Sequence, residues 1–156
     1  MAEDAVNIIA AHLNFAGSAW SKKACLPGGD IFTSSPSNQN VIEFKHFVQQ
    51  CGDRYHWLPL SIVSRMARAY GSRIHQVLAG CVDGPSMGEQ VLQGLYACEI
   101  RYLCMKEFAM SAHDILWRRT KLGLHLPANA AEILEIWLAD QLPRWKQDNV
   151  VETFEK

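Results

Sequence analysis

The sequence predicts an all-α fold, a compact bundle of five to six helices with no substantial sheet. Apolar residues recur at spacings of three and four in several separate windows, which is the period of an amphipathic helix. No stretch of useful length alternates apolar with polar residues, as a half-buried strand would. The 156 residues are 49% hydrophobic and 20% charged, so the chain is large enough and apolar enough to bury a core.

The first 40 residues predict one helix and a linker. Residues 1–13 carry an apolar stripe formed by Ala2, Val6, Ile9, Ala10 and Leu13. Pro27-Gly28 suits a type II turn, and the polar run 34–38 is typical of a connector. We therefore expect three parts: residues 1–26 as a helix and linker that belong to another packing unit, 27–126 as the main helical domain, and 127–156 as a terminal helix and tail.

Three helices are predicted between residues 41 and 79. The first covers 41–51, with a stripe from Val41 to Cys51, and ends at Gly52. The second begins at Pro59, a residue favoured at a helix start, and ends at Gly71. A short third helix over 72–79 should point three residues inward, namely Ile74, Val77 and Leu78.

The second half of the chain predicts a loop over 80–90, because glycine and proline concentrate there, and then three helices. The helix at 95–109 is apolar around nearly its whole circumference, Phe108 included, so we expect it at the centre. The capping pattern Ser111-Ala112-His113-Asp114 starts another helix, which should end at Gly123. The last helix, 128–142, should be interrupted by Pro143 before a frayed tail, and its inward residues are Ile133, Leu134, Trp137, Leu138 and Leu142.

Composition argues against several classes of protein. A net charge of −1 gives no electrostatic reason to expect nucleic acid or an anionic membrane as a partner. No apolar run approaches the roughly 18 residues of a membrane span, and the N-terminus lacks the basic region of a secretory signal. The five cysteines, which are scattered, should be free thiols in a reducing cytosol: Cys25, Cys51, Cys81, Cys98 and Cys104. We expect a cytoplasmic location.

The sequence offers no catalytic, cofactor-binding or metal-ligating residue. His-Glu-x-x-His and the calcium loop Asp-x-Asp-x-Asp-Gly are both absent. Gly28-Gly29 and Gly84-x-x-x-Gly88 match neither the dinucleotide fingerprint nor a P-loop, so we interpret them as turns.

Two groups of charged residues allow a functional and a structural interpretation. The first could clamp a phosphate through its guanidinium groups, but an ion-pair network that fixes one helix on the next is favoured because Asp114 and Arg118 already suit a local i, i+4 pair. The second, on a helix with a following turn, could form a DNA-reading helix-turn-helix, although a solvated or partner-docked face is favoured. The first group is Glu99, Arg101, Glu107, Asp114, Arg118, Arg119 and Lys121, and the second is Arg65, Arg68 and Arg73.

Each of the five tryptophans buries a large area when it packs. Trp117 and Trp137 fall on apolar faces, so we expect them in the core. Trp20, in the linker, and Trp145, beyond Pro143, are candidates for exposed anchors.

The most informative stretch is Glu99-Ile100-Arg101-Tyr102-Leu103, then Glu107-Phe108-Ala109, then the run from Asp114 to Leu124, Asp-Ile-Leu-Trp-Arg-Arg-Thr-Lys-Leu-Gly-Leu. It resembles the C-terminal helical domain of the FAD-dependent, aerobic glycerol-3-phosphate dehydrogenases. Leu26-Pro27-Gly28-Gly29 resembles the linker of that family, and the run from Arg68 to Ser72 resembles a helix corner of the same domain. The resemblance covers residues 1–126.

The resemblance implies an accessory domain of an enzyme that oxidises glycerol 3-phosphate to dihydroxyacetone phosphate by hydride transfer to FAD and passes electrons to quinone. In that family the residues that touch flavin and substrate precede the helix matched by residues 1–13, so no site residue transfers to this chain and we expect the chain alone to be inactive. The flavin domain of the same parent chain is the implied partner, residues 1–13 would be the closing helix of that absent domain, and a homodimer is allowed. The parent would be peripheral, at the cytoplasmic face of the inner membrane. An autonomous all-α binding module, for nucleic acid or protein, is the alternative, and a free-standing enzyme with an unrecognised site is a weaker one.

Overall fold

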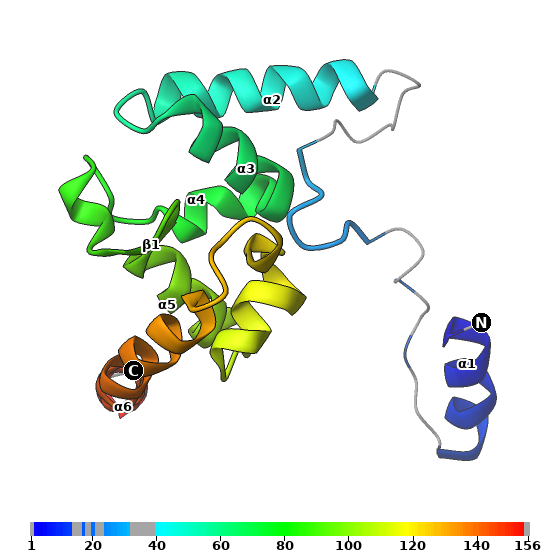
Figure 1. Ribbon diagram of the computed structural model, residues 1–156. Helices are drawn as coiled ribbons and strands as arrows, with labels where there is room; N and C mark the ends of the chain where they lie inside the picture. The colour runs from blue at the N-terminus through cyan, green and yellow to red at the C-terminus, as the bar shows by residue number, and fades with distance from the viewer. Residues whose placement is uncertain (1, 14–16, 18–19, 21–23, 32–39, 155–156) are drawn as a thin grey trace.

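In the computed structural model, helix α5 (Ala97–Lys106) lies in the lower half of the body, with α4 (Ile74–Val77) above it and α6 (Ala130–Phe154) below it (Figure 1). The structure describes residues 2–13, 17, 20, 24–31 and 40–154. Within these ranges the helices are α1 (Ala2–Leu13), α2 (Asn40–Arg54), α3 (Leu60–Tyr70), α4, α5 and α6. Short 3₁₀ turns lie at Gly71–Arg73, Pro85–Met87 and Leu122–Leu124, and a π-helical turn at Asp114–Arg119. The predicted all-α fold is confirmed.

A two-stranded antiparallel hairpin precedes α5. It consists of β1 (Gln90–Leu92) and β2 (Leu95–Tyr96), with Gln90 opposite Tyr96 and Leu92 opposite Leu95. The prediction that a helix begins at 95 is therefore wrong by two residues, because strands of two and three residues are too short to show an alternating pattern. The hairpin is too small to change the fold class.

Helix α2 runs past the glycine at which it was expected to end. Gly52 lies inside the helix, which continues to Arg54. A Cβ at Gly52 would stand 3.3 Å from Leu60 Cδ1, so the absence of a side chain lets α3 pack closely against α2. Phe47 and Cys51 are the buried residues of α2, and Tyr55, the residue after the helix, is buried too.

The corner between α3 and α4 depends on two glycines from distant parts of the chain. Gly71 ends α3 as predicted, with φ of 56°, and Gly28 has φ of 87°. Gly29 N–H donates to the Leu26 carbonyl at 2.8 Å, which confirms the predicted turn at Pro27-Gly28. Ser72 N–H donates to the Gly28 carbonyl at 3.0 Å, and the Ser72 hydroxyl bonds Asp30. The turn at 26–29 is therefore attached to the body.

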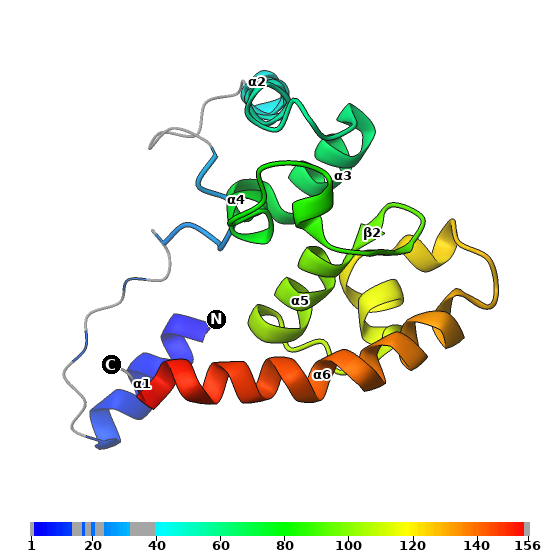
Figure 2. The same cartoon turned by 90° about the vertical axis from the view of Figure 1, so that its left-hand side faces the viewer.

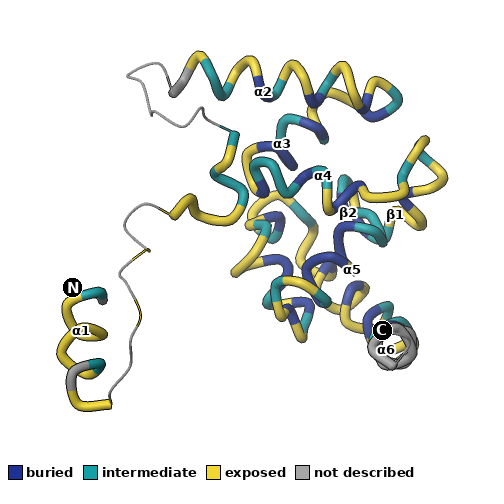
Figure 3. Tube along the Cα trace, turned by 180° about the vertical axis from the view of Figure 1, so that it is seen from behind, coloured by how far each residue is buried: buried dark blue, intermediate teal, exposed yellow. Residues whose placement is uncertain are grey.

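The core forms where α3, α4, α5 and the first half of α6 meet. Its fully buried side chains include Val63, Met66, Ile74, Leu95, Ile100, Leu103, Ile115, Leu134 and Leu138. Figure 3 shows this burial concentrated on α3, on α5 and around the hairpin. The predicted central position of α5 is confirmed, and so is the inward orientation of Ile74, Val77 and Leu78. Phe108 was expected in this helix, but it lies beyond the end of α5 and is 81% exposed.

The segment after α5 begins as predicted and ends differently. The Ser111 hydroxyl accepts a hydrogen bond from Asp114 N–H at 3.2 Å, which confirms the cap. The helical turn then widens to π geometry and stops at Arg119, because Lys121 takes a left-handed φ of 60°. Gly123, the predicted end, instead lies under Trp117: a Cβ there would be 2.6 Å from the indole ring. Trp117 is 38% exposed, so the prediction that it belongs to the core is wrong.

Helix α6 continues through the proline expected to interrupt it. Pro143 lies inside the helix, which runs to Phe154 along the lower edge of the molecule beneath α5 (Figure 2). Trp145 is buried and packs on Trp137, with ring centroids 5.6 Å apart, so a contact spans the proline. Trp145 is therefore not the exposed anchor that we expected. Ile133, expected inward, is exposed.

Helix α1 stands apart from the body in Figures 1 and 3. Its apolar residues face solvent: Val6, Ile8, Ile9 and Leu13 are each more than half exposed, and so is Trp20 in the linker. The polar run 34–38 lies outside the described residues. Among the described helices, none is long and apolar enough to cross a membrane.

Candidate functional site

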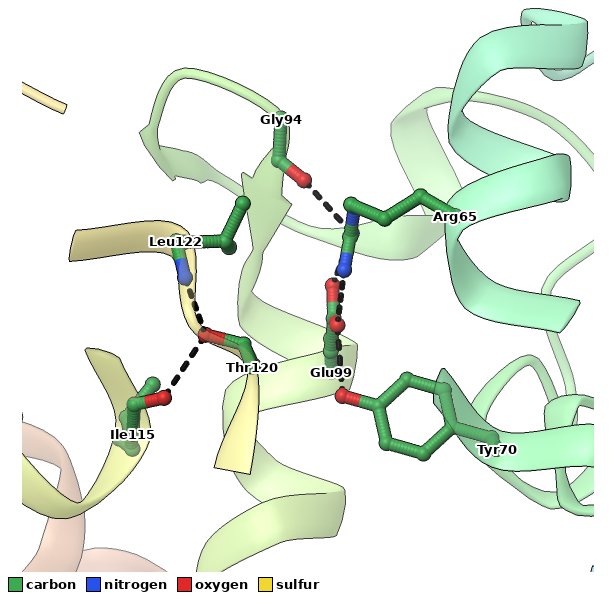
Figure 4. Close-up of polar contacts among 7 residues, drawn as sticks. All are labelled: Arg65, Tyr70, Gly94, Glu99, Ile115, Thr120 and Leu122. Atoms are coloured by element: carbon green, nitrogen blue, oxygen red, sulfur yellow. Dashed lines mark hydrogen bonds and ion pairs between the residues drawn. The ribbon is translucent and has the colours of Figure 1, made fainter. Parts of the chain in front are cut away.

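The most elaborate polar site is a buried cluster in which Arg65, Tyr70 and Glu99 meet between α3 and α5 (Figure 4). Glu99 is 0% exposed. Its two carboxylate oxygens each accept a hydrogen bond of 2.7 Å from the Arg65 guanidinium, and Oε1 also accepts one of 2.6 Å from the Tyr70 hydroxyl. Arg65 donates a further bond of 2.8 Å to the Gly94 carbonyl in the hairpin turn. The cluster thus joins two helices and the hairpin.

Local structure explains why these side chains converge. Glu99 lies in the first turn of α5, where the free N–H groups and the helix dipole favour a carboxylate. Arg65 and Tyr70 come from the middle and the end of α3. A guanidinium presents two parallel N–H groups that match the two oxygens of a carboxylate, which is the arrangement observed.

The electrostatics of the cluster favour a fixed ion pair over proton transfer. Burial, reinforced by the charge of Glu99 and the hydrogen bond to it, raises the pKa of Tyr70 far above its ordinary value. Burial alone would lower the pKa of Arg65, but its hydrogen bonds to Glu99 and the charge of that carboxylate outweigh burial, and the pKa is raised. Tyr70 therefore stays protonated and Arg65 stays charged. Since Glu99 is inaccessible to solvent, we interpret the cluster as structural.

The charged group expected to form one network divides into separate contacts. Glu99 pairs with Arg65 on another helix and not with its near neighbours in sequence. Asp114 and Arg118 form the predicted i, i+4 pair at 2.9 Å. Arg101 is exposed and lines a pocket. A single network that fixes one helix on the next is therefore wrong, although Glu99 does fix α5 on α3.

The three arginines considered for DNA reading have separate roles. Arg65 is engaged by Glu99, with only 24% of its side chain exposed. The Arg68 guanidinium lies 5.6 Å from the centre of the Phe44 ring, and Arg73 Nη1 is 3.4 Å from the Tyr102 hydroxyl. Arg65 therefore does not contribute to the solvated or partner-docked face that we expected for this group.

A pocket of about 540 Å³ opens between α4, α5 and α6. Cys81 and Cys98 both line it, with Trp137 and Trp145 on the α6 side and Arg101 among the polar residues. Burial, and then the neighbouring Cys81, raises the pKa of Cys98 to about 12. Burial also raises the pKa of Cys81. Neutral thiols are poor nucleophiles and poor metal ligands, so the two cysteines form no reactive pair at neutral pH.

A half-buried histidine, His75, lies on α4. The Tyr55 hydroxyl and His75 Nδ1 are hydrogen-bonded at 2.8 Å, and the Phe47 ring packs edge-on against the imidazole. Burial, with help from the charge of Arg54, lowers the pKa of His75, so the ring is neutral near pH 7. The Phe47 ring lies against this histidine and the Tyr55 phenol engages its Nδ1, so His75 helps pack α4 against α2. In the described part of the chain, no group of three or more metal-ligating side chains comes together.

Sequence reasoning missed the Arg65–Glu99 contact, and one signal could have revealed it. Glu99 is an acidic residue in a helix whose apolar residues cover nearly the whole circumference, which indicates a buried carboxylate that needs a cation as its partner. Sequence reasoning also missed the hydrogen bond of 2.9 Å from Trp137 Nε1 to Glu89, which joins α6 to the residue before the hairpin. No comparable signal in the sequence indicates this contact.

Comparison with known proteins identifies the family of this helical domain. A family model described as the C-terminal domain of alpha-glycerophosphate oxidase matches residues 19–146. The glycerol-3-phosphate dehydrogenase of Pseudomonas aeruginosa is 37% identical over 143 residues, which are 92% of this chain and 26% of the relative. The aerobic glycerol-3-phosphate dehydrogenase of Escherichia coli is 30% identical over 140 residues, 90% of this chain and 26% of the relative.

A third relative extends the range of substrates. The D-erythritol 1-phosphate dehydrogenase of Brucella abortus is 36% identical over 110 residues, 70% of this chain and 20% of the relative. The chain thus spans about a quarter of the length of the curated relatives that it matches. On this evidence the chain belongs to the family of C-terminal domains of alpha-glycerophosphate oxidase and the glycerol-3-phosphate dehydrogenases.

Proposed function

We propose that this chain serves as the C-terminal structural domain of an FAD-dependent sn-glycerol-3-phosphate dehydrogenase and carries no catalytic group itself. The family match over residues 19–146 supports the proposal, since it spans most of this chain and that family is named for a C-terminal domain. The parent reaction would be the oxidation of glycerol 3-phosphate to dihydroxyacetone phosphate, with FAD as the first acceptor and quinone as the next.

The residues of this chain do not fit FAD. A dinucleotide is usually held at the carboxyl edge of a parallel sheet, with its pyrophosphate on a glycine-rich turn. The strands in the described residues form one short antiparallel hairpin, and the sequence has no Gly-x-Gly-x-x-Gly. The flavin and the substrate would therefore bind in the part of the relatives that this chain does not span.

The choice of substrate follows the more extensive matches. Relatives named for glycerol 3-phosphate cover 90% or more of this chain in Pseudomonas aeruginosa and Escherichia coli, whereas the relative named for D-erythritol 1-phosphate covers 70%. Both substrates are polyol phosphates, so the general chemistry is shared. The partner would be the flavin domain, a homodimer is allowed, and the parent enzyme would work at the cytoplasmic face of the inner membrane.

The test is a chimera in which this chain replaces the matched C-terminal quarter of the Pseudomonas aeruginosa relative. We expect a yellow protein that oxidises glycerol 3-phosphate with an artificial electron acceptor. The 156-residue chain alone should be colourless and inactive in the same assay. Flavin absorbance or glycerol 3-phosphate oxidation by the chain alone would contradict the proposal, and so would a folded chimera that lacks activity.

The alternative, an autonomous nucleic-acid-binding module, has less support from the geometry. Of its three arginines, Arg65 is engaged in the cluster with Glu99 and Arg68 lies over the Phe44 ring. We expect no salt-sensitive retention of duplex DNA by the isolated chain. Micromolar binding at physiological salt that is abolished by Arg68→Ala, and that falls with salt as phosphate contacts require, would favour the alternative.

A further inference from the structure

Phe108 combines a disfavoured backbone conformation with a solvent-exposed ring. Its φ is 58°, in the left-handed region that crowds the Cβ of every residue except glycine, and it is 81% exposed. The backbone explains the conformation: Glu107 N–H and Ala109 N–H both donate to the Leu103 carbonyl, at 3.1 and 3.0 Å, which reverses the chain after α5. Glycine is the usual residue at such a helix end. Packing within the part of the chain that the structure describes therefore does not account for a phenylalanine there.

The segment that follows Phe108 shares these features. Lys121 is the other non-glycine residue with a positive φ in the described chain. Between the two lies the π-helical turn, a geometry that is frequent at functional sites. The exposed side chains of this segment, which we call the 108–121 face, are Phe108, Met110, His113, Trp117, Arg118, Arg119 and Lys121. In Figure 1 the segment is the yellow stretch in the lower half of the body, away from α2.

Hydrogen bonds hold the 108–121 face together. Met110 N–H donates to one oxygen of the Asp114 carboxylate at 3.0 Å, and Arg118 pairs with the other oxygen at 2.9 Å. The Lys121 ammonium bonds the Trp117 carbonyl. The apolar corner at Phe108 is therefore connected through Asp114 to the basic end of the segment.

The chemistry of the 108–121 face defines its partner. Three apolar side chains are exposed beside three cations, and one carboxylate, Asp114, balances one of those cations. Arg119 and Lys121 have no carboxylate partner in the part of the chain that the structure describes, so the face is net positive. A complementary surface would be apolar and bordered by carboxylates.

We propose that the 108–121 face docks this domain onto the N-terminal, catalytic part of a glycerol-3-phosphate dehydrogenase, with the Phe108 ring as the anchor. The inference rests on the proposed function and adds the surface that performs it. About three quarters of each relative's length lies outside the region that this chain matches. Two parts of one polypeptide meet at high effective concentration, so a small apolar face is sufficient for docking. A strained residue persists when a contact compensates for it, and the catalytic part would supply that contact.

The experiment compares Phe108→Gly in the isolated chain and in the chimera described above. In the isolated chain the melting temperature should stay the same or rise, because glycine suits the left-handed φ and no packing is lost. In the chimera the melting temperature should fall, and amide exchange over residues 108–121 should become faster. Without the substitution, exchange over 108–121 should be slower in the chimera than in the isolated chain. Val82→Gly, at a loop residue that is 75% exposed, is the matched control and should act equally in both proteins.

Three results would overturn the docking proposal. One is the same shift in melting temperature from Phe108→Gly in both proteins. Another is a concentration-dependent dimer of the isolated chain that Phe108→Gly abolishes, which would assign the face to a second copy. The third is binding of the chimera to vesicles containing anionic phospholipid that is lost in Phe108→Gly while amide exchange is unchanged.

Failure of docking and failure of the proposed function give different results. An active chimera in which Phe108→Gly acts as it does in the isolated chain would remove only the docking surface. A chimera without activity that still shows the opposite effects of Phe108→Gly would retain the docking surface and remove the assigned reaction.

Discussion

At the scale of single residues, Glu99 shows how one buried charge organises the domain. Its carboxylate is fully buried, yet three hydrogen bonds from Arg65 and Tyr70 satisfy it. A buried ion pair adds little stability relative to a pair of apolar side chains of the same size. Removal of one partner, however, leaves the charge of the other buried without a counter-charge. The cluster therefore specifies how α3, the hairpin and α5 fit together.

We predict that Glu99→Gln lowers the free energy of unfolding by about 3–5 kcal/mol, because the amide keeps the shape of the side chain but leaves the Arg65 charge uncompensated. Urea denaturation at pH 7 measures this change. Asp140→Asn is the control: it breaks the exposed Asp140–Arg144 pair of 2.8 Å and should cost no more than about 1 kcal/mol. Equal effects of the two substitutions would show that the buried cluster is dispensable.

We also predict a loss of stability at alkaline pH to which Cys98 contributes. Burial raises the pKa of Cys98 to about 12 from an ordinary value of 9.0, so the folded state favours the neutral thiol. Its stabilising contribution is complete below pH 9 and is lost as the pH rises from 9 toward 12, at up to about 1.4 kcal/mol per pH unit. Cys98→Ala should reduce the decline in unfolding free energy between pH 9 and 10, whereas Cys25→Ala, at an exposed thiol, should not. An identical decline in both variants would contradict the assignment.

At the scale of helices and turns, the sequence predicted the starts of elements better than their ends. Ser111 and Pro59 mark helix starts because a cap or a first-turn residue acts locally. Three residues were wrongly predicted to end helices. Two of them are glycines that allow close packing: Gly52 leaves room for Leu60, and Gly123 lies under Trp117. The third is Pro143, which α6 tolerates and continues past. A glycine that permits close packing and one that stops a helix look the same in a sequence.

The cost of a close backbone contact at a glycine can be measured separately from the cost of its backbone conformation, and we predict that Gly71→Ala is much more destabilising than Gly80→Ala. Both residues have positive φ, 56° and 79°. A Cβ at Gly71 would lie 1.8 Å from the Gly28 carbonyl oxygen, whereas nothing lies within 4 Å of one at Gly80. Gly80→Ala should cost about 1–2 kcal/mol for its conformation alone. Gly71→Ala should cost more by at least about 1 kcal/mol in thermal or urea unfolding, because the attachment of the 26–29 turn must also shift. Similar costs would show that this attachment adds no stability.

At the scale of the whole molecule, the sequence predicted the fold class and the family. It did not predict which large apolar side chains are exposed on the surface. Helical periodicity predicted the inward residues of α4, and the run from Asp114 to Leu124 carried the resemblance. The exposure of a side chain depends on how the helices pack. Trp117 was therefore expected in the core but is exposed, and Trp145 was expected to be exposed but is buried. Phe108 was predicted inside the helix and lies beyond its end, because a left-handed residue at a helix end leaves no periodic signal.

The last prediction concerns α1, which this chain does not bury. A helix of 12 residues is marginal by itself in water, and its apolar residues Val6 and Ile9 are more than half exposed. We expect the amides of residues 6–13 to exchange much faster than those of 100–106 in α5. The double substitution Val6→Ser with Ile9→Ser should leave the melting temperature of the isolated chain unchanged, because little packing is lost, whereas Leu134→Ser with Leu138→Ser should unfold it. In the chimera the change at Val6 and Ile9 should become destabilising if residues 1–13 pack on the flavin domain. Strong protection of α1 in the isolated monomer, together with a lower melting temperature of the Val6 and Ile9 variant, would instead make α1 an integral part of this domain and move the expected boundary at residue 26.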